Sequence, residues 1–281
     1  MREISAELIR DTIARLAMEA CCTLPTSTLE AMRRAEKNEQ SPTGRCILGQ
    51  LIKNAGIAEE EHVPVCQDTG LAVVFAEIGQ DVHISGGLFE DAVNQGIAKG
   101  YTEGYLRKSS VAEPVFERCN TGDNTPAIIH TRLVAGDRIT LCLAPKGAGS
   151  ENKGALHMLV PADGIDGVKK AVLETVRHAG ASPCPPMVIG VGIGGNMEQA
   201  CLCAKKACVR DVGTHNPDSR YAALEDELLA LINKLGTGPA GLGGSVTAFA
   251  VHVEFCATHI ASMPVAININ CNAARHASAV L

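Results

Sequence analysis

Residues 63–78 have the sequence Val-Pro-Val-Cys-Gln-Asp-Thr-Gly-Leu-Ala-Val-Val-Phe-Ala-Glu-Ile. The second half of this stretch is apolar, is partly β-branched and ends at Gly79, which is typical of a buried strand. The Pro before and the Gly after residues 66–69 predict a tight turn, which presents a thiol, an amide, a carboxylate and a hydroxyl from a rigid support. A purely structural interpretation is also open, in which Asp68 and Thr69 bond to their own turn and Cys66 is a small core residue.

The composition of the chain bounds its class. It has 281 residues, of which 46% are hydrophobic and 20% charged, and this is typical of a globular protein with one large domain or two modest ones. The formal net charge of -6 comes with no basic stripe, which argues against a nucleic-acid partner. No apolar stretch reaches about 18 residues, so we expect no membrane span. The N-terminus opens with an amphipathic helix pattern and no apolar signal region, so we expect a cytoplasmic protein.

The periodicity of apolar residues predicts an α/β fold. Residues 4–21, 27–37 and 43–55 have helical patterns, with Ser27 or Thr28 as the N-cap of the second helix and Gly56 ending the third. Residues 127–134 and 138–144 are two strand patterns joined by Ala-Gly-Asp, which predicts a hairpin. We therefore expect the N-terminal helices to pack on a mixed sheet in a single domain over residues 1–281, with residues 1–60 as its helical part.

A glycine motif offers one functional alternative. Residues 187–191 form a strand pattern that leads into Gly190, Gly192 and Gly195, and a helix is predicted over residues 197–209. This arrangement satisfies GxGxxG between a strand and a helix, and Asp211 lies near the distance expected of a ribose-binding acid. The motif is common by chance in a glycine-rich sequence, so an NAD-binding protein remains an alternative hypothesis.

Two polar loops are further candidates for binding. Residues 100–126 are weakly periodic, and a loop of this length in a compact domain is typically functional. Within it, Arg107 is either a fork for a carboxylate or a solvated charge. Residues 146–152, Lys-Gly-Ala-Gly-Ser-Glu-Asn, form a glycine-rich loop whose backbone amides could approach an anion. The Lys precedes the glycines, so this is not a Walker-type phosphate loop.

Twelve cysteines are many for this chain, and a reducing compartment argues against a disulfide framework. Most of them lie in helical or strand patterns and are interpreted as core residues. Cys66, Cys184 and Cys271 lie instead at junctions beside Pro, Gly or Asn. Three isolated thiolates are one too few for a fully ligated four-iron cluster, and would leave one iron open as a Lewis acid. Zinc is the alternative metal, but structural zinc sites usually have close ligand pairs, which are absent here.

Several separated motifs resemble those of one family. The chain has Cys-Gln-Asp-Thr-Gly at 66–70, Asn-Thr-Gly-Asp-Asn at 120–124, the loop at 146–152, Cys-Pro-Pro at 184–186 and the segment 259–271, in this order. These elements resemble the α subunit of class I, iron-sulfur fumarate hydratases over nearly the whole chain. The related tartrate dehydratase α subunit shares the first and fourth elements, while its usual glycine loop and C-terminal motif are less similar.

The resemblance implies a cofactor and a set of site residues. The cofactor is a 4Fe-4S cluster, and its ligands are Cys66, Cys184 and Cys271. The residues that match the family's substrate pocket are Gln67 and Asp68, with Asp68 as a catalytic acid; Arg107, as a ligand of a substrate carboxylate; Gly149, through its backbone; and His259, as a pocket histidine.

The resemblance also implies the reaction and a partner. The expected activity is the reversible hydration of fumarate to L-malate, and dehydration of tartrate or of another 2-hydroxy-dicarboxylate is the alternative. Single-chain members of the family continue into a smaller C-terminal domain. We therefore expect a separate β subunit that completes the active site and supplies the base, in a heterotetramer or around a homodimer of α chains.

Overall fold

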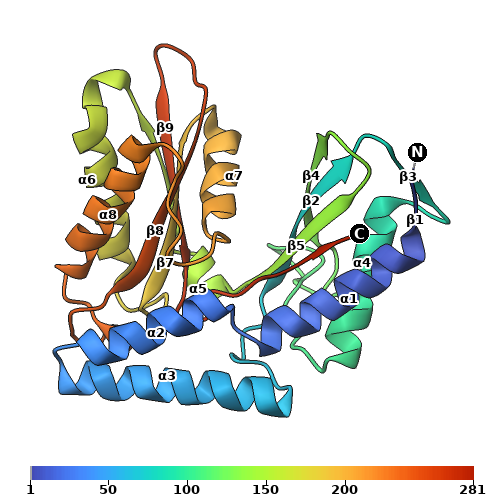
Figure 1. Cartoon of the computed structure of the whole chain (residues 1–281), viewed down its shortest axis with the longest axis horizontal. Helices are drawn as coiled ribbons and strands as arrows, with labels where there is room; N and C mark the ends of the chain where they lie inside the picture. Colours follow the sequence, from blue (N-terminus) through green and yellow to red (C-terminus); the bar gives the residue numbers. More distant parts are fainter. Residues whose placement is uncertain (1) are drawn as a thin grey trace. The chain divides into compact units, whose positions relative to one another are not determined.

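The computed structural model describes residues 2–281, and the chain forms two compact units (Figure 1). Unit 1 contains the chain up to Leu24, Ala55–Ala148 and Arg275–Leu281, and unit 2 contains Pro25–Asn54 and Gly149–Ala274. Each unit has helices packed on a mixed β-sheet, so the predicted α/β class is confirmed. Whether the two units act as the single predicted domain stays a prediction. No helix within residues 2–281 has the length and apolar character needed to cross a membrane.

The three predicted N-terminal helices are present as α1 (Ala6–Cys22), α2 (Thr26–Asn38) and α3 (Pro42–Glu61). The predicted N-cap of α2 is wrong, because the helix begins after Pro25 without a side-chain cap. The predicted end of α3 is also wrong, since Gly56 lies inside the helix. Ala55 and Ala58 on either side of it are 5% and 2% exposed, so packing of the helix face continues past the glycine and outweighs its low helix propensity.

The sheet of unit 1 has the order β10-β5-β2-β4. The central strand β2 runs antiparallel to β5 and parallel to β4. Helices α1 and α4 pack against each other, and their side chains share one apolar core with those of the sheet (Figure 1). A separate parallel pair is formed by β1 and β3. The bounds of these elements are β1 Arg2–Ser5, β2 Leu71–Gly79, β3 Val82–Ser85, α4 Phe89–Glu103, β4 Ile128–Val134, β5 Ile139–Lys146 and β10 Ala277–Val280.

The predicted hairpin of residues 127–144 is wrong, although both of its strands exist. Strands β4 and β5 lie on opposite sides of β2 and do not pair with each other. The end of β2 is bonded to the connection between them, because the Gly79 amide donates to the Arg138 carbonyl at 2.8 Å and the Gln80 amide donates to the Val134 carbonyl at 2.8 Å. An apolar strand such as β2 needs partners on both edges, and this tertiary pairing replaces the local one.

The sheet of unit 2 has the order β6-β9-β7-β8. Helices α6 and α8 cover one face and α7 covers the other (Figure 1). All eight residues of β7 are buried, as expected for a strand with helices on both sides. The bounds are β6 Ala155–Leu159, η1 Pro161–Asp163, α6 Gly164–Ala179, β7 Met187–Gly194, α7 Met197–Ala207, α8 Ser219–Asn233, η2 Pro239–Gly241, β8 Ala248–Cys256 and β9 Met263–Asn270.

The two sheets share one pattern of connections. In unit 1 the central strand β2 is parallel to β4 and antiparallel to β5, the next strand along the chain. In unit 2 the central strand β7 is parallel to β8 and antiparallel to β9, again the next strand along the chain. The fourth strand, β10 or β6, then pairs with the antiparallel one. The sequence has no visible repeat, so this correspondence exists at the level of topology.

The glycines of the GxGxxG motif have a packing role. Gly190 and Gly192 lie inside β7, and a Cβ atom on them would lie 2.1 Å from the Ala204 carbonyl oxygen and 2.0 Å from that of Ala200. Only glycine therefore lets α7 approach the strand this closely. A dinucleotide motif instead places its first glycines in the turn after the strand, so helix packing explains this motif without a nucleotide.

Candidate active site

The turn at residues 66–70 is fixed to unit 1 through its backbone. The Val65 amide donates to the Cys21 carbonyl at 2.9 Å, and the buried Tyr101 hydroxyl donates to the Thr69 carbonyl at 2.8 Å. Gly70 has a φ of +70°, and a Cβ atom there would lie 2.5 Å from the backbone carbon of Lys146. Glycine is required at this position because both the conformation and the close approach exclude a side chain.

The carboxylate of Asp68 is oriented by two backbone donors. Oδ1 accepts from the Gly70 amide at 3.0 Å, and Oδ2 accepts from the Ala148 amide at 2.9 Å. Ala148 begins the short helix α5 (Ala148–Glu151), so part of the predicted glycine-rich loop is helical. A carboxylate has about four acceptor positions, and two remain for a proton or a ligand. The structural interpretation, in which Asp68 bonds to its own turn, is therefore correct for Oδ1. The carboxylate also keeps acceptor positions that a ligand could use.

Two further segments converge on this turn. The Thr69 hydroxyl donates to the Arg107 carbonyl at 2.7 Å, and the Asn124 amide group donates to the Gly70 carbonyl at 3.1 Å. Asn124 is fully buried, and its Oδ1 accepts from the amides of Ser109 and Ser110 at 2.6 and 3.1 Å. The Arg107 side chain is exposed, which leaves its guanidinium accessible to a ligand. Sequence reasoning did not single out Asn124, although its place in Asn-Thr-Gly-Asp-Asn was the available signal.

Arg275 is a second residue that the sequence analysis did not single out and that contacts the turn. It is only 4% exposed, and its Nη2 donates to the Asp68 carbonyl. Its Nε and Nη1 have no hydrogen-bond partner within the described part of the chain. Burial raises the pKa of the nearby Cys21 thiol to about 12, and the Arg275 charge opposes this shift. Cys21 therefore stays a neutral core thiol, as predicted, and Arg275 anchors the turn.

Cys66 lies in the turn with a backbone N–H donor directed at its sulfur. Its side chain is half-buried, and the Asp68 amide donates to its Sγ at 3.4 Å. The thiol in this structure donates to Gln67 Oε1 at 3.5 Å, and the rest of the exposed Gln67 side chain faces solvent.

Cys184 and Cys271 lie close together in unit 2. The Asn272 amide and its Nδ2 donate to the Cys184 carbonyl at 3.0 and 2.9 Å, which joins the segment before β7 to the segment after β9. Cys184 is exposed and has a φ of 53°, an unusual conformation for a residue with a side chain. Cys184 lies outside helix and strand, in agreement with its predicted place at a junction beside Pro. Gly149 lies near the same segment, because a Cβ atom on it would be 3.6 Å from the Ser182 carbonyl oxygen.

His259 is at the other end of this sheet. It lies between β8 and β9, whereas Cys271 follows the eight residues of β9. A strand of this length spans about 25 Å, so unit 2 does not bring His259 together with Cys184 and Cys271. The ring is exposed, and its Nδ1 accepts from the Ala261 amide at 3.1 Å, which places the proton on Nε2.

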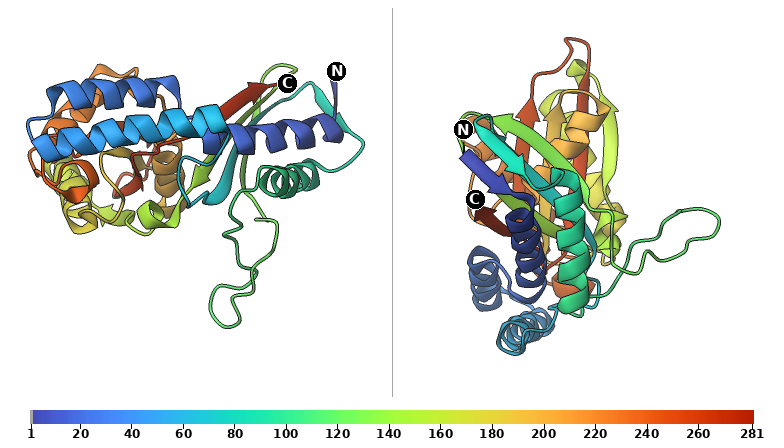
Figure 2. Two further views of the ribbon diagram at one scale, coloured as in Figure 1. Left: turned by 90° about the horizontal axis from the view of Figure 1, so that it is seen from below. Right: turned by 90° about the vertical axis from the view of Figure 1, so that its right-hand side faces the viewer.

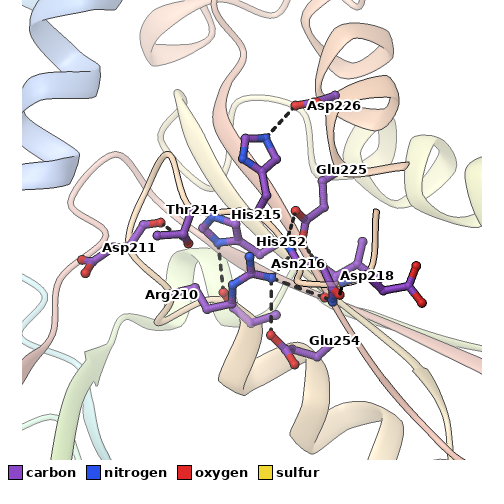
Figure 3. Close-up of polar contacts among 12 residues, drawn as sticks. Arg210, Asp211, Thr214, His215, Asn216, Asp218, Glu225, Asp226, His252 and Glu254 are labelled. Carbon is purple, nitrogen blue, oxygen red and sulfur yellow. Dashed lines mark hydrogen bonds and ion pairs between the residues drawn. The ribbon is translucent and has the colours of Figure 1, made fainter. Parts of the chain in front are cut away.

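A buried polar network in unit 2 has no counterpart in the sequence predictions (Figure 3). Glu225 is 2% exposed and accepts from Arg210 Nη1 at 2.8 Å, the Val253 amide at 2.7 Å and the Asn216 amide at 2.9 Å. His252 donates from Nδ1 to the Ala207 carbonyl at 3.1 Å, and burial together with the Arg210 charge lowers its pKa to about 4. Every bond of this network is internal, so it fixes the connection between α7 and α8 on β8.

Among residues 2–281 no disulfide joins the cysteines, and no group of three or more His, Cys, Asp or Glu side chains that could hold a metal is present. The cluster ligand set therefore stays a prediction. The residues that the structure does assemble are, in unit 1, Cys66, Asp68, Asn124, Arg275 and the backbone of Arg107, and in unit 2, Cys184, Cys271, Asn272 and Gly149.

The fold and these motifs define a class of enzyme. Residues 10–280 match the model of the fumarate hydratase (Fumerase) family, so the chain belongs to this family. This confirms the resemblance inferred from the motifs.

Individual relatives narrow the class further. A protein of Methanocaldococcus jannaschii, provisionally named L(+)-tartrate dehydratase subunit alpha, is 43% identical over 273 residues, which are 96% of this chain and 96% of the relative. The L(+)-tartrate dehydratase subunit alpha of Escherichia coli K12 is 28% identical over 271 residues, which are 95% of this chain and 88% of the relative. The chain is thus a hydro-lyase of the class I type.

Proposed function

We propose that this chain is the α subunit of a cytoplasmic hydro-lyase that catalyses the reversible hydration of fumarate to L-malate with a 4Fe-4S cluster. The observation that carries the proposal is the turn at residues 66–70. It combines an exposed amide, an oriented carboxylate and a half-buried thiol with an N–H donor, in a chain of the fumarate hydratase family. Neighbouring groups of this kind, held by a rigid backbone, suit a substrate-binding and catalytic site.

Cys66, Cys184 and Cys271 are the cluster ligands in this proposal. The donor chemistry fits, since all three are cysteines in loops with at least part of each residue accessible. When bound, the cluster would supply one open iron, a Lewis acid for a hydroxyl or carboxylate oxygen.

The chain's own residues would bind and orient the substrate. In the dehydration direction, Asp68 would act as the acid and transfer a proton from its carboxyl group to the departing hydroxyl, which leaves as water. Gln67 would donate to a substrate oxygen, and the exposed Arg107 guanidinium would hold a carboxylate. The Gly149 backbone would approach the substrate, since nothing lies closer than 3.6 Å to the space a Cβ would fill. Stabilising the charge that develops on a carboxylate is the main catalytic contribution expected of such donors.

His259 enters the proposal only through another chain. The length of β9 argues against a catalytic role beside Cys184 and Cys271 of its own unit. The proposal therefore assigns the pocket role of His259 to a site shared with a second copy of this chain, in the expected assembly with two α chains.

A β subunit is the proposed partner. The relatives from M. jannaschii and E. coli K12 are named as alpha subunits, which supports a separate second subunit for this chain. In the proposal this subunit supplies the base and further cationic ligands for the dicarboxylate.

Dehydration of L(+)-tartrate is the second candidate, and the names of these relatives favour it. Both substrates are small dicarboxylates with a hydroxyl or double bond between the carboxylates, so the residues described above serve either reaction. Kinetic comparison of L-malate, fumarate and L(+)-tartrate with the assembled enzyme decides between them.

The test of the proposed function starts from anaerobically purified chain. We expect about four iron and four sulfide per chain, degraded or lost in Cys66→Ser, Cys184→Ser and Cys271→Ser. Cys46→Ser, which changes an exposed cysteine of α3, is the matched control and should keep the cluster. Failure to take up a cluster after reconstitution, or full retention in all three variants, would contradict the proposed ligand set.

A further inference from the structure

The long connection between α4 and β4 contains an ordered arm, residues 111–120. Figure 2 shows it projecting from unit 1 in both views. Its two sides are bonded to each other, since Val111 and Asn120 form an isolated β-bridge and the Ala112 amide donates to the Cys119 carbonyl at 2.8 Å. The arm is therefore a built element and not an irregular loop.

The tip of the arm is organised by one carboxylate. Glu113 accepts from the amides of Val115, Phe116 and Glu117 at 2.5, 2.6 and 2.9 Å, and these bonds lower the pKa of its carboxyl group. Arg118 Nη1 also donates to the Pro114 carbonyl across the tip. The backbone that carries Val115 and Phe116 is thus fixed before any partner binds.

This fixed backbone holds two large apolar side chains in water. Phe116 is 86% exposed and Val115 is 68% exposed. Exposing an aromatic ring on a preorganised turn has no benefit for the stability of unit 1, because the ring is not buried on folding. Rigid aromatic side chains of this kind typically anchor protein interfaces, where they fill an apolar pocket at a low entropy cost.

The base of the arm is joined to the proposed active site. Asn120 Nδ2 donates to the Lys108 carbonyl at 3.0 Å, and the Thr121 amide donates to the Ser110 carbonyl at 3.0 Å. The next residues towards the site are Arg107 and Asn124, which bond to Thr69 and Gly70 of the turn. A protein that holds the tip is therefore held at a defined position relative to residues 66–70.

We propose that the arm is a docking element for the β subunit and that Phe116 inserts into an apolar pocket of that subunit. This inference rests on the proposed function, because it takes the partner from there. The subunit that completes the substrate site has to approach the turn at residues 66–70, and the arm is the projecting element whose base is bonded to that turn. Docking through the arm would place the partner's catalytic groups beside Asp68 and Arg107.

The first experiment measures association of the chain with the β-type subunit of the same organism by sedimentation velocity. Phe116→Ser should weaken the complex by about 30-fold or more, as loss of an interface anchor does. Leu133→Ser is the matched control, since Leu133 is 74% exposed in β4 of the same unit, and it should leave association unchanged. Circular dichroism and iron content should equal those of the natural chain in both variants. Unchanged association in Phe116→Ser would overturn the proposal.

A second measurement identifies the protein that contacts position 116. A photo-crosslinking p-benzoylphenylalanine at position 116 of the assembled enzyme should give a covalent adduct with the mass of one α and one β chain. An adduct of two α chains would overturn the proposal in favour of contact with a second copy. The hydro-lyase assay of the natural complex keeps the two proposals separable. An active complex that tolerates Phe116→Ser contradicts the arm alone, and an inactive complex that depends on Phe116 supports the arm and contradicts the function.

Discussion

Asp68 is held by backbone donors on both of its carboxylate oxygens, from Gly70 and Ala148. Asp68→Asn would replace one acceptor with an NH2 group that faces a backbone N–H, so one of these bonds is lost. We expect kcat of the assembled enzyme to fall by about 10²-fold or more, as on removal of a general acid, and the free energy of unfolding to fall by about 1–3 kcal/mol. Iron content should not change, because no ligand is altered.

The matched control is Asp137→Asn, an exposed carboxylate between β4 and β5 of the same unit. It should leave kcat and thermal unfolding unchanged. An Asp68→Asn enzyme with natural kcat would show that the carboxyl group does not transfer a proton.

At this scale the sequence predicted the turn well, since Pro64, Gly70 and the polar residues between them are local signals. Asn124 and Arg275 contact the turn from far along the chain. Asn124 lies in the motif at 120–124, but no local pattern shows that either residue reaches the turn.

Among the elements, the connection between α7 and α8 depends on a histidine that is kept neutral. Burial and Arg210 lower the pKa of His252 from 6.5 to about 4. The unfolded chain binds a proton at this histidine near pH 6.5, whereas the folded chain binds it only near pH 4. The histidine therefore lowers the free energy of unfolding as pH falls from about 6.5 to 4, and this loss does not grow further below pH 4. The expected loss is about 3 kcal/mol. Chemical denaturation across this pH range, with natural protein against His252→Gln, measures it.

His178→Gln on α6 is the control, since that histidine is exposed in the same unit. It should retain the pH dependence that His252→Gln loses. A stability profile with the same slope in the natural chain and His252→Gln would contradict the assignment of this pH dependence to His252.

Element types were predictable because periodicity is local, as the helices and β2 show. Strand pairing was not predictable from local patterns, because burial of β2 decides that β4 and β5 pair with it and not with each other. The end of α3 was not predictable either, because the helix continues past Gly56 where its face stays packed.

At the scale of the whole molecule, the proposed function assigns cluster binding to this chain and makes turnover depend on the β subunit as well. The chain supplies the predicted ligands Cys66, Cys184 and Cys271 and the exposed Arg107, whereas a dicarboxylate has a second carboxylate to be bound and a carbon-bound proton to be removed. In the proposed function those tasks belong to the β subunit, so the isolated chain should contain about four iron yet show at least about 10²-fold lower kcat than the complex. Anaerobic titration with β, assayed on fumarate and L(+)-tartrate, should restore the rate at constant iron content. Full activity of the isolated chain would place the base among its own residues, and an increase in iron with the rate would instead make the partner necessary for cluster assembly.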